Sequence, residues 1–352
     1  MAETLIEPLS VVLPQVTWIG VMIKAILILA IVSALAGFGT FVERKVLAFM
    51  QRRLGPMHVG PYGLLQIAAD GIKLFTKEDI IPQNANKLIF MIAPIITAAT
   101  AFIALAAVPV FPDFTVPDWI PLIGGEFVPS IASDINVGIL FVLGMMAAGL
   151  YGPLLAGMSQ ANKWGIIGAA RTAVQFLSYE VVTGLSILAP IMLVGSLSFV
   201  DFNNYQHGEG VWLMFYQPVA FVLFLIAGFA ETNRTPFDLL EHEAEVVSGY
   251  ATEYSGMRWG MFFIGEYANM ITISVIAAIV FMGGYNPETT LFGFSIGWLL
   301  IMLKITFFFF LMLWVRASWP HIRPDQLMWL CWKVLMPIAV INLIITGLVI
   351  MI

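Results

Sequence analysis

The sequence predicts an all-α, polytopic membrane protein. Three observations lead to this prediction: 60% of the 352 residues are apolar, only 11% are charged, and the mean hydropathy is +0.92. A soluble globular domain carries about 25% charged and about 45–50% apolar residues. The low share of charge therefore excludes a water-soluble enzyme, and we expect a single integral membrane domain over residues 1–352.

Eight apolar stretches are long enough to cross a bilayer, because a spanning helix needs about 20 mostly apolar residues. The predicted spans cover residues 15–42, 86–111, 135–159, 165–199, 211–230, 257–283, 291–316 and 329–352. The sequence thus predicts about eight transmembrane helices.

Basic residues predict how these helices are oriented. Lys and Arg occur in four connections, which are residues 43–86, 160–164, 231–256 and 317–328. They are absent from the alternate connections, which are residues 112–134, 200–210 and 284–290. Since cytoplasmic loops carry an excess of Lys and Arg, we expect both termini on the outer side. The acidic N-terminal segment is unlike a transit peptide, which favours a bacterial inner (plasma) membrane; the alternative is synthesis inside an organelle.

The connection at 43–86 contains a predicted interfacial helix after the first span. Two Gly-Pro pairs, Gly55-Pro56 and Gly60-Pro61, precede it. Apolar residues then share one helical face: Leu64, Leu65, Ala68, Ile72 and Phe75. Polar residues share the other: Gln66, Asp70, Lys73 and Lys77. This pattern is typical of an amphipathic helix in the membrane interface. The alternative is a basic loop that anchors on anionic lipid.

The connection at 231–256 is rich in carboxylates. Thr235-Pro236-Phe237-Asp238 is typical of a helix start, with a Thr cap and Pro at the first position. On the helix expected to follow, Asp238, Glu241 and Glu245 share one face, and Glu243 lies beside it. Crowded carboxylates acquire separate pKa values in a dry site, as a proton relay requires. The alternative is a solvated acidic helix.

Ionisable residues also occur inside the predicted spans, where each costs about 2.5–3.5 kcal/mol on insertion scales. They include Glu180, Glu266 and Lys304. Counting about 1.5 Å per residue places Glu266 and Lys304 at comparable depths, so we expect them to pair if their helices touch. Together with the acidic connection, these residues predict a polar path toward mid-membrane. The alternative is a buried structural ion pair.

Metal and cofactor chemistry is not expected on this chain. One cysteine is too few for a Cys-ligated iron–sulfur cluster or a Cys-based zinc site, and the four histidines lie outside the apolar stretches. We therefore expect no metal site and no catalytic residue. Membrane lipid is an expected partner, and nucleic acid is not.

Four segments of the chain resemble the H subunit of proton-pumping NADH:quinone oxidoreductase (respiratory complex I). They are Glu43–Glu78, Gly168–Glu180, Arg234–Tyr254 and Trp314–Lys333. The resemblance covers nearly the whole chain and keeps the motifs in order. It implies an eight-helix membrane subunit joined to other membrane-arm and hydrophilic-arm subunits. It also implies that quinone is the substrate and that NAD, FMN and iron–sulfur clusters are bound by partner subunits.

The same resemblance implies roles for individual residues. A quinone channel would be lined by Arg44, Arg53, Phe263, Tyr267 and Arg316. An acidic path that couples quinone reduction to proton translocation would contain Glu180, Asp238, Glu241, Glu243, Glu245 and Glu266.

Two other functions are alternatives to this one. A homologous subunit can serve a complex that takes electrons from ferredoxin, deazaflavin, formate or hydrogen; the Glu-Arg-Lys and Arg-Thr-Pro-Phe-Asp motifs favour the quinone-reducing branch. A free-standing secondary transporter predicts inverted repeats, and none is visible in the sequence.

Overall fold

The computed structural model describes residues 18–109, 114–115, 127–128, 135–239, 246–285, 290–291, 294–295 and 297–351. Helices joined by turns and loops make up most of these residues, which confirms the predicted all-α class. The strands among the described residues form two short antiparallel hairpins, β1 (Phe114–Thr115) with β2 (Phe127–Val128) and β3 (Thr290–Leu291) with β4 (Phe294–Ser295).

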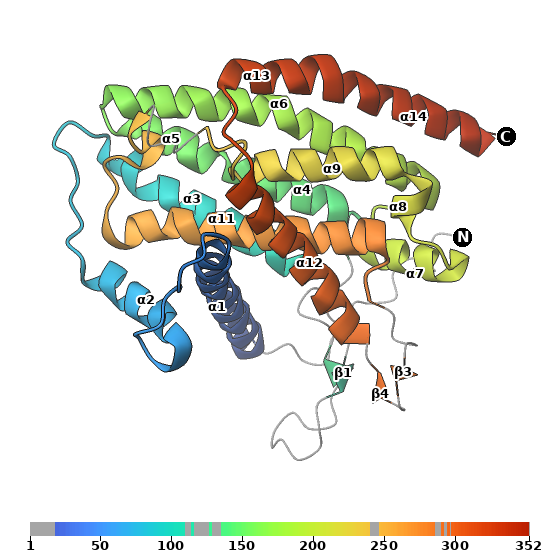
Figure 1. Ribbon diagram of the computed structural model, residues 1–352, viewed down its shortest axis with the longest axis horizontal. Coiled ribbons are helices and arrows are strands. Elements are labelled where there is room, and N and C mark those ends of the chain that lie inside the picture. Colours follow the sequence, from blue (N-terminus) through green and yellow to red (C-terminus); the bar gives the residue numbers. More distant parts are fainter. Residues whose placement is uncertain are drawn as a thin grey trace.

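The helices follow the predicted apolar stretches in order (Figure 1). They are α1 (Trp18–Met50), η1 (Pro61–Gly63), α2 (Gln66–Thr76), α3 (Lys87–Ala106), α4 (Gly138–Gly149), α5 (Tyr151–Ser159), α6 (Lys163–Val194), α7 (Phe199–Glu209), α8 (Leu213–Tyr216), α9 (Pro218–Glu231), η2 (Gly249–Ala251), α11 (Gly256–Ile276), η3 (Ala277–Phe281), α12 (Gly297–Ser318), α13 (Pro324–Leu330), η4 (Cys331–Leu335) and α14 (Met336–Met351).

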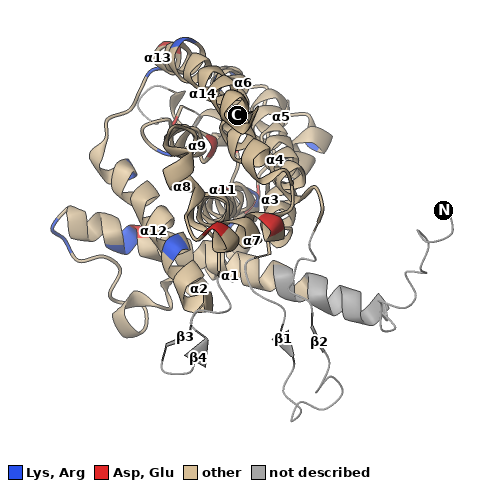
Figure 2. Cartoon of the chain, turned by 90° about the vertical axis from the view of Figure 1, so that its right-hand side faces the viewer, with Lys and Arg blue, Asp and Glu red and all other residues tan. Residues whose placement is uncertain are grey.

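Six helical segments of the described chain are long and apolar enough to cross a membrane. They are Lys87–Ala106, Gly138–Ser159, Lys163–Val194, Gly256–Phe281, Gly297–Ser318 and Pro324–Met351. Charged residues interrupt their ribbons at few places (Figure 2). The protein is therefore an integral membrane protein. The other two predicted spans correspond to α1 and to α9, which has 14 residues and directly follows α8. The count of eight spans remains a prediction.

The segment formed by α11 and η3 is the centre of the bundle, and α14 lies at its edge (Figure 1). In the apolar stretch of Gly256–Phe281, 78% of the residues are buried, compared with 17% in Pro324–Met351. Helices α1, α2, α3 and α12 all contact α11. Gly39 permits the close approach of α1, because a Cβ there would lie 3.0 Å from Cδ1 of Tyr267.

The predicted amphipathic helix is present as α2. Its Ile67 and Leu74 side chains lie against Gly37 of α1 and Gly260 of α11. The predicted apolar face is exposed on this chain, as expected for a face that a bilayer covers; its residues are Leu64, Leu65, Ala68, Ile72 and Phe75. The helix is confirmed, and its position in the membrane interface remains a prediction.

The four connections that carry Lys and Arg meet at one end of the bundle. Hydrogen bonds tie them or their flanking residues together: Asn86 N to Ser159 O (2.9 Å), Asn162 Nδ2 to Glu253 Oε1 (2.9 Å), Ser255 Oγ to Glu78 O (3.0 Å) and Ile322 N to Pro236 O (3.0 Å). This common end agrees with the predicted topology. Which side of the membrane it faces remains a prediction.

The helix predicted to begin at Pro236 does not begin there. Residues 232–239 form turns and bends, the Thr235–Pro236 peptide bond is cis, and Phe237 N donates to Arg234 O at 2.8 Å. Phe237 and Leu239 are both buried in the core, which draws this segment inward instead of along a helix on the surface. The face predicted for Glu241, Glu243 and Glu245 lies outside the described residues.

Candidate functional site

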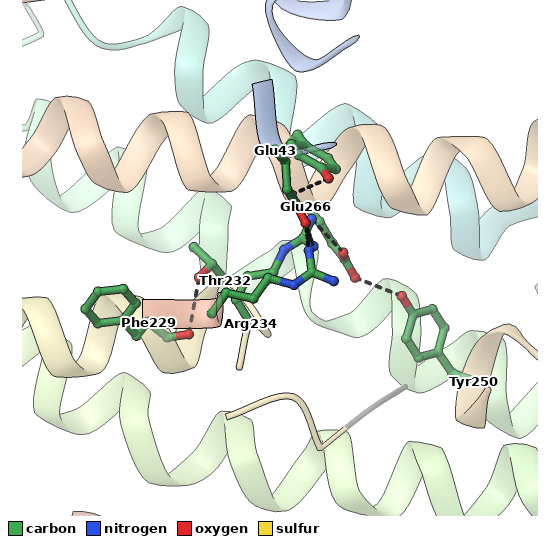
Figure 3. A network of polar contacts seen from close by, with 8 residues as sticks. Glu43, Phe229, Thr232, Arg234, Tyr250 and Glu266 are labelled. Atoms are coloured by element: carbon green, nitrogen blue, oxygen red, sulfur yellow. Dashed lines mark hydrogen bonds and ion pairs between the residues drawn. The ribbon is translucent and has the colours of Figure 1, made fainter. Parts of the chain in front are cut away.

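Four elements bring oppositely charged side chains together inside the bundle (Figure 3). Glu43 comes from α1, Arg234 from the turn after α9, Glu266 from α11 and Arg316 from the end of α12. We call these four residues the buried charge cluster. Glu43 and Arg234 are each only 4% exposed. Charges at such depth persist only when opposite charges and hydrogen bonds compensate them.

Arg234 lies at the centre of the cluster. Its Nη1 atom is 3.5 Å from Oε1 of Glu43, and its Nη2 atom is 3.7 Å from Oε2 of Glu266. Its Cζ atom lies 4.6 Å from the ring centroid of Tyr267 and 5.8 Å from that of Phe263. Because a guanidinium is permanently charged, Arg234 offsets the negative charge of carboxylates on both sides of it.

Two further donors act on Glu43. The Tyr267 hydroxyl donates to Oε2, and Nη1 of Arg316 pairs with Oε1. Glu266 accepts a hydrogen bond from the Tyr250 hydroxyl at 3.1 Å (Figure 3). Two carboxylates thus face two guanidiniums and two phenols, so that a charge added or removed here disturbs the whole set.

Close packing of η2 on α6 fixes the position of Tyr250. A Cβ at Gly168 would lie 2.7 Å from Tyr250 N, so glycine at 168 is required for this contact. The Gln160 side chain donates to Tyr250 O, and the Phe262 ring packs edge-on at 5.1 Å between centroids. Local packing therefore fixes the position of the Tyr250 hydroxyl, which donates to Glu266.

The residues predicted to line a quinone channel divide into two groups. Tyr267 and Arg316 contact Glu43, and Phe263 lies beside Tyr267 with 5.1 Å between ring centroids. Arg44 instead forms an exposed ion pair with Asp70 of α2 at 2.6 Å. Arg53 lies beyond the end of α1 and lines a separate surface pocket.

The residues predicted for a proton path are spread more widely. Glu266 belongs to the cluster, and Asp238 lies in the turn that follows Arg234. Glu180 lies within α6, and its side chain is exposed on the outside of the chain. Glu241, Glu243 and Glu245 lie outside the described residues.

Lys304 does not pair with Glu266. Its Nζ atom donates to the backbone carbonyls of Met282 (2.7 Å) and Gly284 (2.8 Å), just beyond the end of η3. The prediction of equal depth is wrong because Arg316, near the end of α12, already lies at the buried charge cluster with Glu266. Lys304 comes earlier on the same helix and therefore lies farther along the bundle (Figure 1). The Trp212 ring, 5.2 Å away, completes the surroundings of Lys304.

Three residues of this site, Glu43, Arg234 and Tyr250, are not among the predicted site residues. Arg234 offered a signal, because it is the only Lys or Arg in the acidic connection 231–256. A lone base of this kind is a candidate for an internal ion pair. Glu231 is also buried, and its Oε2 atom has no hydrogen-bond partner among the described residues.

The carboxylates of the site can exchange protons, and its guanidiniums and phenols can donate hydrogen bonds that bind and orient an acceptor. In the described part of the chain, no three His, Cys, Asp or Glu side chains are grouped so that they could hold a metal ion.

The fold and the cluster define a polytopic helical membrane protein with a charge-balanced site in its interior. The family described as NADH dehydrogenase matches residues 23–347. Three relatives are named as the H subunit of NADH-quinone oxidoreductase. That of a Nitratiruptor species is 72% identical, over 94% of this chain and 97% of the relative. That of Wolinella succinogenes is 66% identical, over 94% of this chain and 98% of the relative. That of Sulfurimonas denitrificans is 62% identical, over 95% of this chain and 98% of the relative. The chain belongs to this H-subunit family.

Proposed function

We propose that the chain forms part of a quinone channel and an acidic path that couples quinone reduction to proton translocation. In this proposal it works inside a proton-pumping NADH:quinone oxidoreductase of a bacterial inner membrane. The other membrane-arm and hydrophilic-arm subunits are its partners and bind NAD, FMN and the iron–sulfur clusters. The name that the relatives share supports NADH as the electron donor over ferredoxin, deazaflavin, formate or hydrogen.

The position of Arg234 carries this proposal, because it lies between two carboxylates and beside two aromatic rings. The Arg234 guanidinium lies over the rings of Tyr267 and Phe263. In this proposal the quinone ring lies beside these aromatic side chains. Tyr267 and Arg316 are hydrogen-bond donors already directed at Glu43. A quinone that gains electrons develops negative charge on its oxygens and competes with Glu43 for these donors.

This competition links electron transfer to proton uptake. A carboxylate that loses a cationic partner in a buried site binds a proton more readily. Glu43 and Glu266 share Arg234, so a change at one carboxylate alters the other. In the proposed path, protons pass between Glu266, Asp238, Glu241, Glu243 and Glu245.

Glu180 forms the far end of the path on this chain. Its side chain is exposed on the surface of α6 that faces away from the bundle, within a helix long and apolar enough to span a membrane. An ionisable group in such a position faces protein or water and not lipid tails. We assign it the transfer of protons to a neighbouring subunit. Lys304 receives a different role, since its ammonium caps backbone carbonyls and lies apart from the carboxylates.

A Tyr267→Phe variant tests the proposal in the assembled complex. The ring remains, but the hydrogen bond to Glu43 is lost, and a bond to a charged group contributes about 1.5–3 kcal/mol. We expect quinone reduction to fall about tenfold or more. NADH oxidation with a water-soluble artificial acceptor should stay unchanged. Tyr205→Phe, in α7, is the matched control. Unchanged quinone affinity and turnover in the Tyr267 variant would refute the proposed channel.

A further inference from the structure

A cavity opens on the surface between the end of α1 and α12, with a volume of about 910 Å³. This size lies in the range of about 300–1,000 Å³ that is usual for ligand sites. Three cations line it together with aromatic side chains: Lys45, Arg52 and Arg53 with Phe49, Phe310 and Trp314. We call this cavity the basic pocket.

The end of α1 places two of the cations at the pocket. Arg52 N donates to Phe49 O at 3.1 Å and Arg53 N to Ala48 O at 2.8 Å, which is the pattern of a Schellman cap. Arg52 has a φ of 54°, a left-handed conformation in which glycine is usual. The chain therefore holds an arginine where a glycine would be accommodated more easily.

The cations of the pocket retain donors for an anion. Among the residues that the structure describes, none of the three forms an ion pair with a carboxylate. Lys45 Nζ contacts the sulfur of Met57 at 3.1 Å, and Arg53 Nε donates to Gln51 Oε1 at 2.7 Å. A guanidinium has five N–H groups and an ammonium three, so further hydrogen bonds are available.

The pocket combines these charges with exposed aromatic surface. Trp314 is 54% exposed, and Phe49 and Phe310 are exposed as well. Tryptophan beside basic residues is typical of the headgroup depth of a membrane. The pocket also lies at the end of the bundle where the Lys- and Arg-bearing connections meet, and anionic lipids attract such residues on the cytoplasmic side.

We propose that the basic pocket binds an anionic phospholipid of the surrounding bilayer. The phosphate lies on Lys45, Arg52 and Arg53, and an acyl chain lies along Phe310 and Trp314. A phosphodiester matches three cations by charge, whereas a neutral quinone offers them only carbonyl acceptors, so this proposal assigns Arg53 to the basic pocket in place of the quinone channel. The lipid bridges α1 and α12, the helices that bring Glu43 and Arg316 together.

Binding of a labelled phosphatidylglycerol to the delipidated, assembled complex tests this site. The variant combines Lys45→Gln with Arg52→Gly. Glycine suits the left-handed position, so the helix end is preserved while the charge is removed. Each basic residue near an anionic surface is worth about fivefold in affinity, so we expect a loss of about 25-fold. The matched control, Lys73→Gln with Lys77→Gln on α2, should bind as the unaltered complex does.

Three results would overturn the proposal. They are equal affinity in the variant and the control, equal binding of labelled phosphatidylcholine, and displacement of the labelled lipid by a short-chain quinone. A photoreactive phosphatidylglycerol provides a second measurement on the unaltered complex, which avoids any question of folding. Crosslinks to the Phe310–Trp314 segment of α12 would support the site, and crosslinks confined to other segments would refute it.

Discussion

The buried charge cluster and the basic pocket lie at the same end of α1 but accommodate positive charge in different ways. In the cluster, Arg234 is almost completely buried and lies within 4 Å of two carboxylates. In the pocket, Lys45, Arg52 and Arg53 line a surface opening. Burial of an ion costs several kcal/mol, whereas an exposed ion keeps its water. A single charge change should therefore disturb the cluster strongly and the pocket little.

The largest effect is expected when Arg234 is replaced by Met. This substitution leaves Glu43 and Glu266 buried with one guanidinium fewer, and breaking such a set costs about 3–5 kcal/mol. We expect a marked fall in the melting temperature and in the amount of assembled complex on native gels. Arg44→Met is the control, because its pair with Asp70 is exposed and worth about 0–1 kcal/mol. Equal losses of melting temperature and assembly in both variants would contradict the expected difference between buried and exposed charges.

Lys304 is an intermediate case between the buried charge cluster and the basic pocket, because backbone carbonyls and not carboxylates compensate its charge. Lys304→Met leaves the carbonyls of Met282 and Gly284 without this donor. We expect a stability loss of about 1–3 kcal/mol, below that of the Arg234 variant. Thermal unfolding of the purified complex measures it. An unchanged melting temperature together with lost proton translocation would return Lys304 to the proton path.

The smallest effect is expected for a buried group that carries no charge. Tyr254, in the connection before α11, donates to Phe90 O at 3.1 Å, so Tyr254→Phe should cost about 1 kcal/mol. Burial raises the pKa of Tyr254 from 10.0 to about 12. Folded and unfolded chains are both protonated below pH 10, and the contribution is lost only between pH 10 and pH 12. The difference in melting temperature from the unaltered complex should therefore be the same at about pH 7 and about pH 9; a dependence on pH in this range would contradict the assignment.

The spans were predictable because apolar runs are local in the sequence. Helix α2 was predictable for the same reason, from the spacing of Ile72, Phe75 and their neighbours. The partners of individual charges were not, because they depend on how helices cross. Lys304 and Glu266 lie at similar counts from the predicted cytoplasmic ends of their spans. Because α12 ends at the buried charge cluster, Lys304 nevertheless lies beyond Glu266 along the bundle.

The turn at Pro236 shows a second limit. Thr-Pro-Phe-Asp resembles a helix start, but the burial of Phe237 and Leu239 outweighs this local preference. Both departures lie beside charged residues, where tertiary contacts decide the structure. The resemblance to a family supplied Tyr267 and Arg316, which periodicity alone does not single out.

The number of protons translocated per electron in a Glu266→Gln variant tests the central claim most directly. Glutamine keeps an oxygen for the Tyr250 hydroxyl but cannot take part in proton exchange or balance Arg234. Sealed vesicles that contain the complex provide the measurement, with Glu209→Gln at the end of α7 as the control. We predict that NADH-driven quinone reduction continues while the proton ratio falls. An unchanged ratio in a fully assembled variant would contradict the coupling of quinone chemistry to the buried charge cluster.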